Sequence, residues 1–184
     1  MPSVRQSFGT ARFMLGLVLS AAAAATPAAV IDATPGGFVV QHEAGIQASP
    51  GKVYAALLQV GRWWNPQHTF SGRSANLSID PRAGGCFCER LPSGGGVEHM
   101  RVVNVQPNKV LRLVGALGPL QGSGLAGSLT WTLTPSGAGT TLKLSYSVGG
   151  YMQGGLDKIA PAVDEVLTDQ IGRLKRLVEG KSLD

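Results

Sequence analysis

The sequence is poor in cysteine, histidine, aromatic and charged residues. Its 184 residues include two cysteines and three histidines, and 6% of the chain is aromatic. The 16 basic and 11 acidic residues give a formal charge of +5, and two of the basic residues, Arg5 and Arg12, lie at the N-terminus. The remaining basic residues form no stripe interleaved with aromatic residues, so we expect no nucleic-acid partner.

The two cysteines, Cys86 and Cys88, are separated by one residue. In a regular strand, residues i and i+2 lie on one face, beyond the usual reach of a disulfide. We therefore predict two free, mostly buried thiols. No second cysteine or histidine pair stands nearby, so we expect no metal site.

Long apolar runs are absent except near the N-terminus. Residues 13–25 are uncharged and rich in alanine and leucine, and they follow the basic residues Arg5 and Arg12. A basic start, a short apolar run and small residues at A-x-A spacing are typical of a secretory signal peptide. The run is shorter than the roughly 20 apolar residues that cross a bilayer, so we expect no stable membrane insertion after cleavage.

We accordingly predict three parts of the chain. Residues 1–25 are a signal peptide, 26–35 a flexible start of the mature protein, and 36–180 a single domain of ordinary size. The mature protein is then periplasmic or secreted.

The hydrophobic pattern along the domain predicts an α+β fold. A first strand at 38–46 is followed by two short helices, of which the first starts at Ser49-Pro50, a capping residue and a proline suited to the first turn. Alternating apolar and polar residues then predict strands at 75–79, 86–91, 97–105, 110–114, 128–133 and 142–148. Apolar residues from Ile159 to Leu177 recur every three or four positions, which is typical of a long amphipathic helix.

One motif suggests a cofactor but lies in the wrong context. Residues 122–127 match G-x-G-x-x-G, yet a strand pattern follows where a dinucleotide site needs a helix. We therefore expect no cofactor and predict a flexible hairpin here.

The order of these elements, together with four short motifs, resembles the START-like helix-grip (SRPBCC) superfamily. The motifs are S-P-G-K-V-Y-A-A-L at 49–57, W-W-N-P at 63–66, D-P-R-A-G-G-C-F at 80–87 and V-V-N-V-Q-P-N-K-V-L at 102–111. Within it, the chain looks most like the polyketide-cyclase and heat-shock-chaperone-ATPase-activator homologues. The resemblance implies a curved antiparallel sheet wrapped around the long C-terminal helix, with a cavity between them. It fixes a fold and not a function, because the family holds carriers, cyclases and chaperone co-factors.

Candidate site residues depend on which faces of the strands point inward. Glu89 shares a face with Phe87. If that face is inward, a carboxylate enters an apolar cavity; the alternative, which we favour slightly, places the two cysteines inside. On the next strand, either His99 and Arg101 point inward, or Met100 and Val102 do. The candidates for catalysis are Glu89, His99, Arg101 and Tyr146, and those for ligand binding are Trp64, Phe87, Trp131, Tyr146 and Val163.

Three functions fit this sequence. The first is an exported domain that binds a small hydrophobic molecule in the cavity. The second is a cyclase-like, lyase or hydrolase enzyme that uses polar residues of the same cavity. The third is an interaction module for another exported protein, with an exposed apolar patch around Trp63 and Trp64. No nucleophile motif decides between them, so whether the protein is an enzyme stays open.

Overall fold

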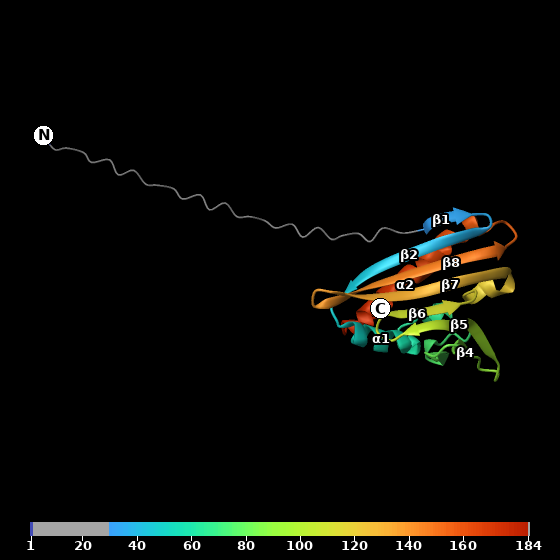
Figure 1. Cartoon of the computed structure of the whole chain (residues 1–184), viewed down its shortest axis with the longest axis horizontal. Helices are drawn as coiled ribbons and strands as arrows, with labels where there is room; N and C mark the ends of the chain where they lie inside the picture. The colour runs from blue at the N-terminus through green and yellow to red at the C-terminus, as the bar shows by residue number, and fades with distance from the viewer. Residues whose placement is uncertain (2–29, 184) are drawn as a thin grey trace.

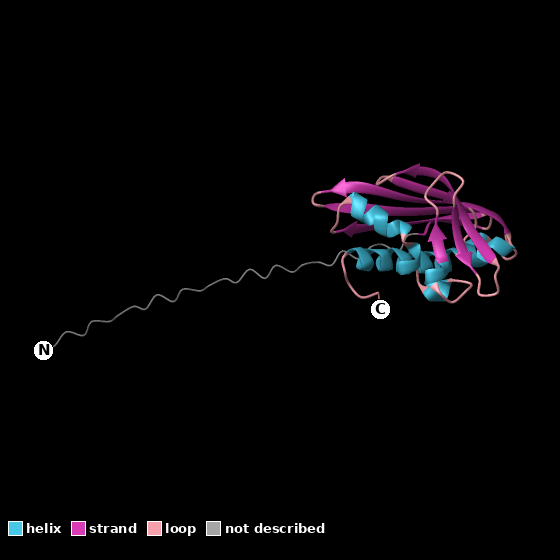
Figure 2. Cartoon of the chain, turned by 90° about the horizontal axis from the view of Figure 1, so that it is seen from below, coloured by secondary structure: helices cyan, strands magenta, loops and turns pink. Residues whose placement is uncertain are grey.

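The computed structural model describes Met1 and residues 30–183, and the predicted signal peptide at 1–25 lies almost wholly outside these residues. Within the described part, eight strands form one antiparallel sheet in the order β1-β2-β8-β7-β6-β5-β4-β3 (Figure 1). The strands are β1 (Val30–Thr34), β2 (Gly37–Ile46), β3 (Leu77–Ile79), β4 (Cys86–Arg90), β5 (Gly96–Gln106), β6 (Val110–Val114), β7 (Gly124–Ser136) and β8 (Gly139–Tyr151). The helices α1 (Pro50–Leu58) and α2 (Ala160–Val178) lie on the same face of the sheet (Figure 2). The predicted helix-grip α+β fold is confirmed.

The long helix α2 packs its apolar stripe against the sheet. Leu167, Ile171 and Leu174 are all buried, and Leu174 is fully enclosed. Burying a leucine side chain contributes about 1.5–3 kcal/mol, so this stripe is a main source of the domain's stability. The helix is followed by Gly180 at a φ of 70°, a left-handed conformation that glycine adopts without strain.

The first helix begins where the sequence predicts. The hydroxyl of Ser49 accepts a hydrogen bond from the backbone N–H of Lys52 at 3.4 Å, and Pro50 occupies the first turn. Short 3₁₀ turns follow at Val60–Arg62 and Pro66–His68, in place of a second regular helix. This segment leads the chain from α1 across to the far edge of the sheet.

Two expectations for loose segments are corrected. Residues 30–34, within the segment predicted to be flexible, form the edge strand β1, which pairs with β2 through backbone hydrogen bonds that composition does not reveal. Residues 124–127 belong to β7 and pair with β8, so they are part of a regular strand and not of the flexible hairpin that we expected at residues 122–127. Gly127 is required there by packing, because a Cβ would stand 2.7 Å from the ring of Tyr146.

A bulge between β4 and β5 decides which side chains face inward. Phe87 pairs with Met100 and Cys88 with Glu98, so His99 is an extra residue of β5 with no partner in the ladder. A bulge re-aims the side chains around it. His99 and Met100 are consequently both buried, while Arg101 is exposed.

The two cysteines contradict our expectation of free, buried thiols. Their sulfurs are joined in a disulfide, and neither residue is fully buried. The Cα atoms lie 5.3 Å apart, within the ordinary range for a disulfide and less than a regular strand would give. The spacing argument assumed a regular strand, whereas β4 lies opposite the bulge. The cysteines occupy the outer face, so the slightly favoured inward placement is also wrong.

Candidate functional site

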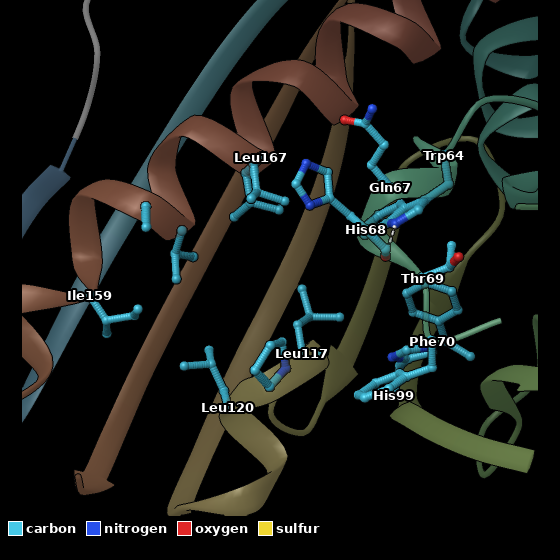
Figure 3. Close-up of a pocket in the computed structure, with 16 residues that line it drawn as sticks. Trp64, Gln67, His68, Thr69, Phe70, His99, Leu117, Leu120, Ile159 and Leu167 are labelled. Carbon is cyan, nitrogen blue, oxygen red and sulfur yellow. Dashed lines mark hydrogen bonds between the residues drawn. The ribbon is translucent and has the colours of Figure 1, made fainter. Parts of the chain in front are cut away.

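A cavity of about 410 Å³ lies between α2, residues 64–70 of the segment after α1, and the loop before β7 (Figure 3). Its volume is within the range of small-molecule sites. Most of the wall is apolar, and the polar side chains are Gln67, His68, Thr69 and His99. The lining residues are Trp64, Gln67, His68, Thr69, Phe70, Phe87, His99, Leu117, Gly118, Pro119, Leu120, Ile159, Ala162, Val163, Val166 and Leu167.

Residues 64–73, which we call the strap, form one wall of this cavity. The indole N–H of Trp64 donates to the carbonyl of His68 at 2.9 Å, which closes the strap on itself. The strap is also tied to α2, because the backbone N–H of Asn65 donates to the side chain of Gln170 at 2.9 Å. The strap thus connects the helix to the far end of the sheet, over the cavity.

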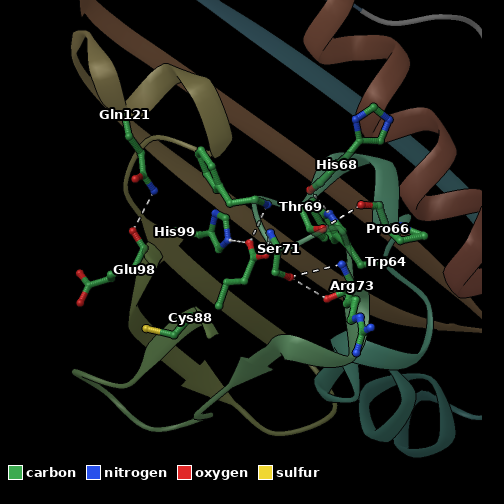
Figure 4. A network of polar contacts seen from close by, with 12 residues as sticks. Trp64, Pro66, His68, Thr69, Ser71, Arg73, Cys88, Glu98, His99 and Gln121 are labelled. Atoms are coloured by element: carbon green, nitrogen blue, oxygen red, sulfur yellow. Dashed lines mark hydrogen bonds and ion pairs between the residues drawn. The ribbon is translucent and has the colours of Figure 1, made fainter. Parts of the chain in front are cut away.

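Glu89 holds the other end of the strap. It is 1% exposed, and its two carboxylate oxygens accept three hydrogen bonds. The backbone N–H groups of Phe70 and Ser71 donate at 3.1 and 2.5 Å, and Nε2 of His99 lies 2.9 Å away (Figure 4). Burial alone would raise the pKa of Glu89, but the bonds from Ser71, Phe70 and His99 outweigh it and hold the pKa below its usual value. Glu89 is therefore an anion at neutral pH.

The ring of His99 lies in the wall of the cavity between two aromatic rings. Its centroid is 5.9 Å from that of Phe70 and 5.1 Å from that of Phe87, at interplanar angles of 28° and 37°. The side chain is almost fully buried, and this burial lowers the pKa of His99 although Glu89 acts in the opposite direction. The imidazole is consequently neutral at neutral pH.

The predicted candidates for catalysis separate into two groups. Glu89 and His99 meet at the cavity, whereas Arg101 is exposed and pairs with Glu98 at 2.5 Å. Tyr146 lies behind the cavity wall, where its hydroxyl accepts from the backbone N–H of Leu117 at 3.0 Å. Burial raises the pKa of Tyr146 to about 12, so it stays protonated and supports the loop that supplies Leu117.

The predicted ligand-binding residues are also divided. Trp64, Phe87 and Val163 line the cavity, while Trp131 and Tyr146 are buried in the core and are not among its lining residues. The sequence identified the apolar strand faces, but it could not separate the cavity wall from the solid core behind it.

The exposed apolar patch expected around Trp63 and Trp64 is absent. Both side chains are buried, with exposed fractions of 1% and 6%. Trp63 packs edge-on against Trp131, whereas Trp64 packs edge-on against Phe87 in the cavity wall. The irregular segment buries both indoles, whose ring centroids lie 5.5 Å apart.

Sequence reasoning missed the contribution of the strap and of the loop at 117–120. The ring of Phe70 stacks on His99. Ser71 binds Glu89 through its backbone N–H, which any residue type could supply, so the sequence gives no sign of this contact. A usable signal was Asn65-Pro66, since an asparagine before a proline marks a capped turn.

A second buried contact between a histidine and a carboxylate lies away from the cavity, between β2 and α2. Nε2 of His42 is 3.0 Å from Oδ1 of Asp164, and both residues are almost fully buried. Burial lowers the pKa of His42 against the influence of Asp164. This contact links the helix to the sheet and does not take part in the site.

The described residues contain no group of three or more histidine, cysteine, aspartate or glutamate side chains placed to hold a metal ion. Among the helices of residues 30–183, none is long and apolar enough to cross a membrane.

Comparison with known proteins places this fold in a family. Residues 38–179 match the family described as polyketide cyclase / dehydrase and lipid transport. The chain belongs to this family. The match spans most of the chain and confirms the resemblance to the START-like helix-grip superfamily seen in the sequence motifs.

Solved structures show the same fold. The chain is similar to the Mll3558 protein of Rhizobium loti, with 25% identity and a TM-score of 0.58 over 76% of this chain and 95% of that one. It is similar to protein MLL2253 of Mesorhizobium loti, with 22% identity and a TM-score of 0.57 over 78% and 98% of the chains. The Aha1 dimer of Colwellia psychrerythraea gives 22% identity and a TM-score of 0.54 over 77% and 96%. A search of curated protein sequences finds no match.

Proposed function

We propose that the protein binds a small hydrophobic molecule in the cavity between the sheet and α2. The observation that carries this proposal is the cavity itself, about 410 Å³ in volume and walled mostly by apolar side chains. Transfer of an apolar ligand from water into such a space is favourable by roughly 25 cal/mol per Å² of buried apolar surface. The family description, which includes lipid transport, also supports the binding of a hydrophobic ligand.

The proposal is tested by filling the cavity. Val163 lies on α2, half-buried in the cavity wall, whereas Glu165 is exposed on the same helix. Binding of a neutral fluorescent probe, N-phenyl-1-naphthylamine, is measured for Val163→Phe and for the control Glu165→Phe. We expect Val163→Phe to lose at least tenfold in affinity and the control to match the unaltered protein. Equal binding by both variants would refute the cavity as the binding site.

The enzymatic alternative rests on a specific observation, the contact of the Glu89 carboxylate with His99 beside the cavity. A carboxylate paired with a neutral imidazole is a common arrangement for general base catalysis. Arg101 and Tyr146, the other proposed members, do not converge on it. Ligand recovered from the protein is analysed by mass spectrometry before and after incubation: an unchanged mass supports binding alone, and a changed mass supports catalysis.

The proposal includes export of the mature protein. It is supported by the signal-peptide pattern of residues 1–25 and by the disulfide between Cys86 and Cys88, because disulfides persist in oxidising compartments. Expression in a bacterial host followed by periplasmic extraction and N-terminal sequencing tests it. A mature protein starting near residue 26 supports export, and an intact N-terminus in the cytoplasmic fraction would contradict it.

A further inference from the structure

The contact between Glu89 and His99 fixes the position of a proton. The ionised carboxylate of Glu89 has no hydrogen to donate, so the bond to His99 requires a hydrogen on Nε2 of the imidazole. A neutral imidazole carries one ring hydrogen. The other nitrogen, Nδ1, must therefore be an unprotonated acceptor.

This acceptor has no partner within the part of the chain that the structure describes. The hydrogen bond of the His99 side chain in residues 30–183 is the one from Nε2 to Glu89, and the ring itself lines the cavity. A polar atom next to an apolar cavity loses its hydrogen bond to water when a ligand fills that space. A ligand that supplies no donor leaves Nδ1 unsatisfied, at a cost in affinity.

The ring cannot turn to avoid this cost. Phe70 and Phe87 both pack against the ring, and Glu89 fixes the edge that carries Nε2. The bulge at His99 places the ring in the wall, so its orientation is set by the backbone of β5 as well. The acceptor is thus preorganised before any ligand arrives.

We propose that Nδ1 of His99 accepts a hydrogen bond from a hydroxyl group of the bound molecule, so that the ligand class is an apolar molecule bearing a hydroxyl. This inference rests on the proposed function, because it concerns a ligand in the same cavity. The cavity has three other polar side chains. Gln67 and His68 are exposed and keep their contact with water, and the hydroxyl of Thr69 already donates to the carbonyl of Pro66 at 2.7 Å. His99 is therefore the residue that selects for the hydroxyl.

Three probes of similar size separate this proposal from its alternatives. 2-Naphthol offers a donor, 2-methoxynaphthalene offers an acceptor alone, and 2-naphthoate offers an anion. We expect the unaltered protein to bind 2-naphthol about three- to tenfold more tightly than 2-methoxynaphthalene, the value of one hydrogen bond. The preference should disappear in His99→Phe, which keeps a flat ring, and persist in the control His68→Phe at the cavity mouth. Tightest binding of 2-naphthoate would overturn the proposal, since an anion calls for a protonated imidazole.

A second measurement uses the unaltered protein, so it does not depend on whether a variant folds. Nitrogen NMR of the full chain labelled with ¹⁵N-histidine reports which ring nitrogen carries the proton. We expect His99 to show a protonated Nε2 and a bare Nδ1, with the Nδ1 resonance shifting on addition of 2-naphthol and not of 2-methoxynaphthalene. A protonated Nδ1, or an equal response to both probes, would refute the inference. If none of the probes binds, the proposed function fails; equal binding of the two neutral probes refutes the hydroxyl preference alone.

Discussion

Glu89 is the residue whose loss should most disturb the site. Replacing it with alanine removes the acceptor of three hydrogen bonds, from the backbone N–H groups of Phe70 and Ser71 and from His99. A buried donor left without a partner costs about 1–3 kcal/mol. The two backbone groups can regain water if the strap moves away. We therefore expect a cost at the lower end of this range, about 1 kcal/mol for each donor, and about 3 kcal/mol for the three donors together.

The control is Glu98→Ala on the neighbouring strand β5. Glu98 pairs with Arg101 at the surface, where both side chains are about half exposed. Exposed pairs of this kind contribute about 0–1 kcal/mol. Each variant removes one carboxylate. The carboxylate of Glu89 binds the strap, whereas that of Glu98 does not.

The assay is urea denaturation combined with amide hydrogen exchange. With a denaturant slope of about 1.5–2 kcal/mol per molar, a loss of about 3 kcal/mol lowers the urea midpoint by about 1.5–2 M. The amides of Phe70 and Ser71 should exchange much faster in Glu89→Ala than in Glu98→Ala, because their acceptor is gone. Equal midpoints, or unchanged protection of these two amides, would show that Glu89 does not hold the strap.

Three further predictions concern the scaffold and its pH response. Leu174→Ala should lower the free energy of unfolding by about 2–5 kcal/mol in urea titrations, because it opens a void under α2. Gly127→Ala should lower the melting temperature, because its Cβ would stand 2.7 Å from the Tyr146 ring; Gly122→Ala, with open space around it, should not. Because the pKa of His99 lies below its ordinary 6.5 when folded, the unfolded chain binds more protons, and stability should fall as the pH drops below about 6.5 in urea titrations; His99→Phe should weaken this fall.

The sequence predicted the regular elements well because their periodicity is local. The six later strands and the long helix were placed to within a few residues, except that β7 and β8 extend further at both ends. In those extensions, Gly124 lies opposite Tyr151 at one end and Ser136 opposite Gly139 at the other. Glycine and serine give no apolar alternation, so their pairing could not be read from the pattern.

The site was predicted less well because it depends on one irregularity. Alternation along β5 allows either His99 or Met100 to face inward, and the bulge brings both inside. A bulge depends on the partner strand, so no pattern within β5 alone could reveal it. The inward face of β4 was assigned to Cys86 and Cys88 for a different reason: the opposite face carries Glu89, and a carboxylate was expected to face water.

The position of Glu89 couples the stability of the domain to the selectivity of the cavity. One carboxylate oxygen accepts from both Phe70 and His99, so the group that holds the strap closed also sets the tautomer of the imidazole. An apolar residue at this position would avoid the cost of burying a charge, but it would leave the strap unattached and the imidazole free to carry its proton on either nitrogen. A charge buried behind an apolar wall is difficult to explain by stability alone, because such groups commonly gain little over a hydrophobic replacement. Its contribution is best understood as orientation: it holds the proton of His99 on Nε2 and leaves Nδ1 as the acceptor.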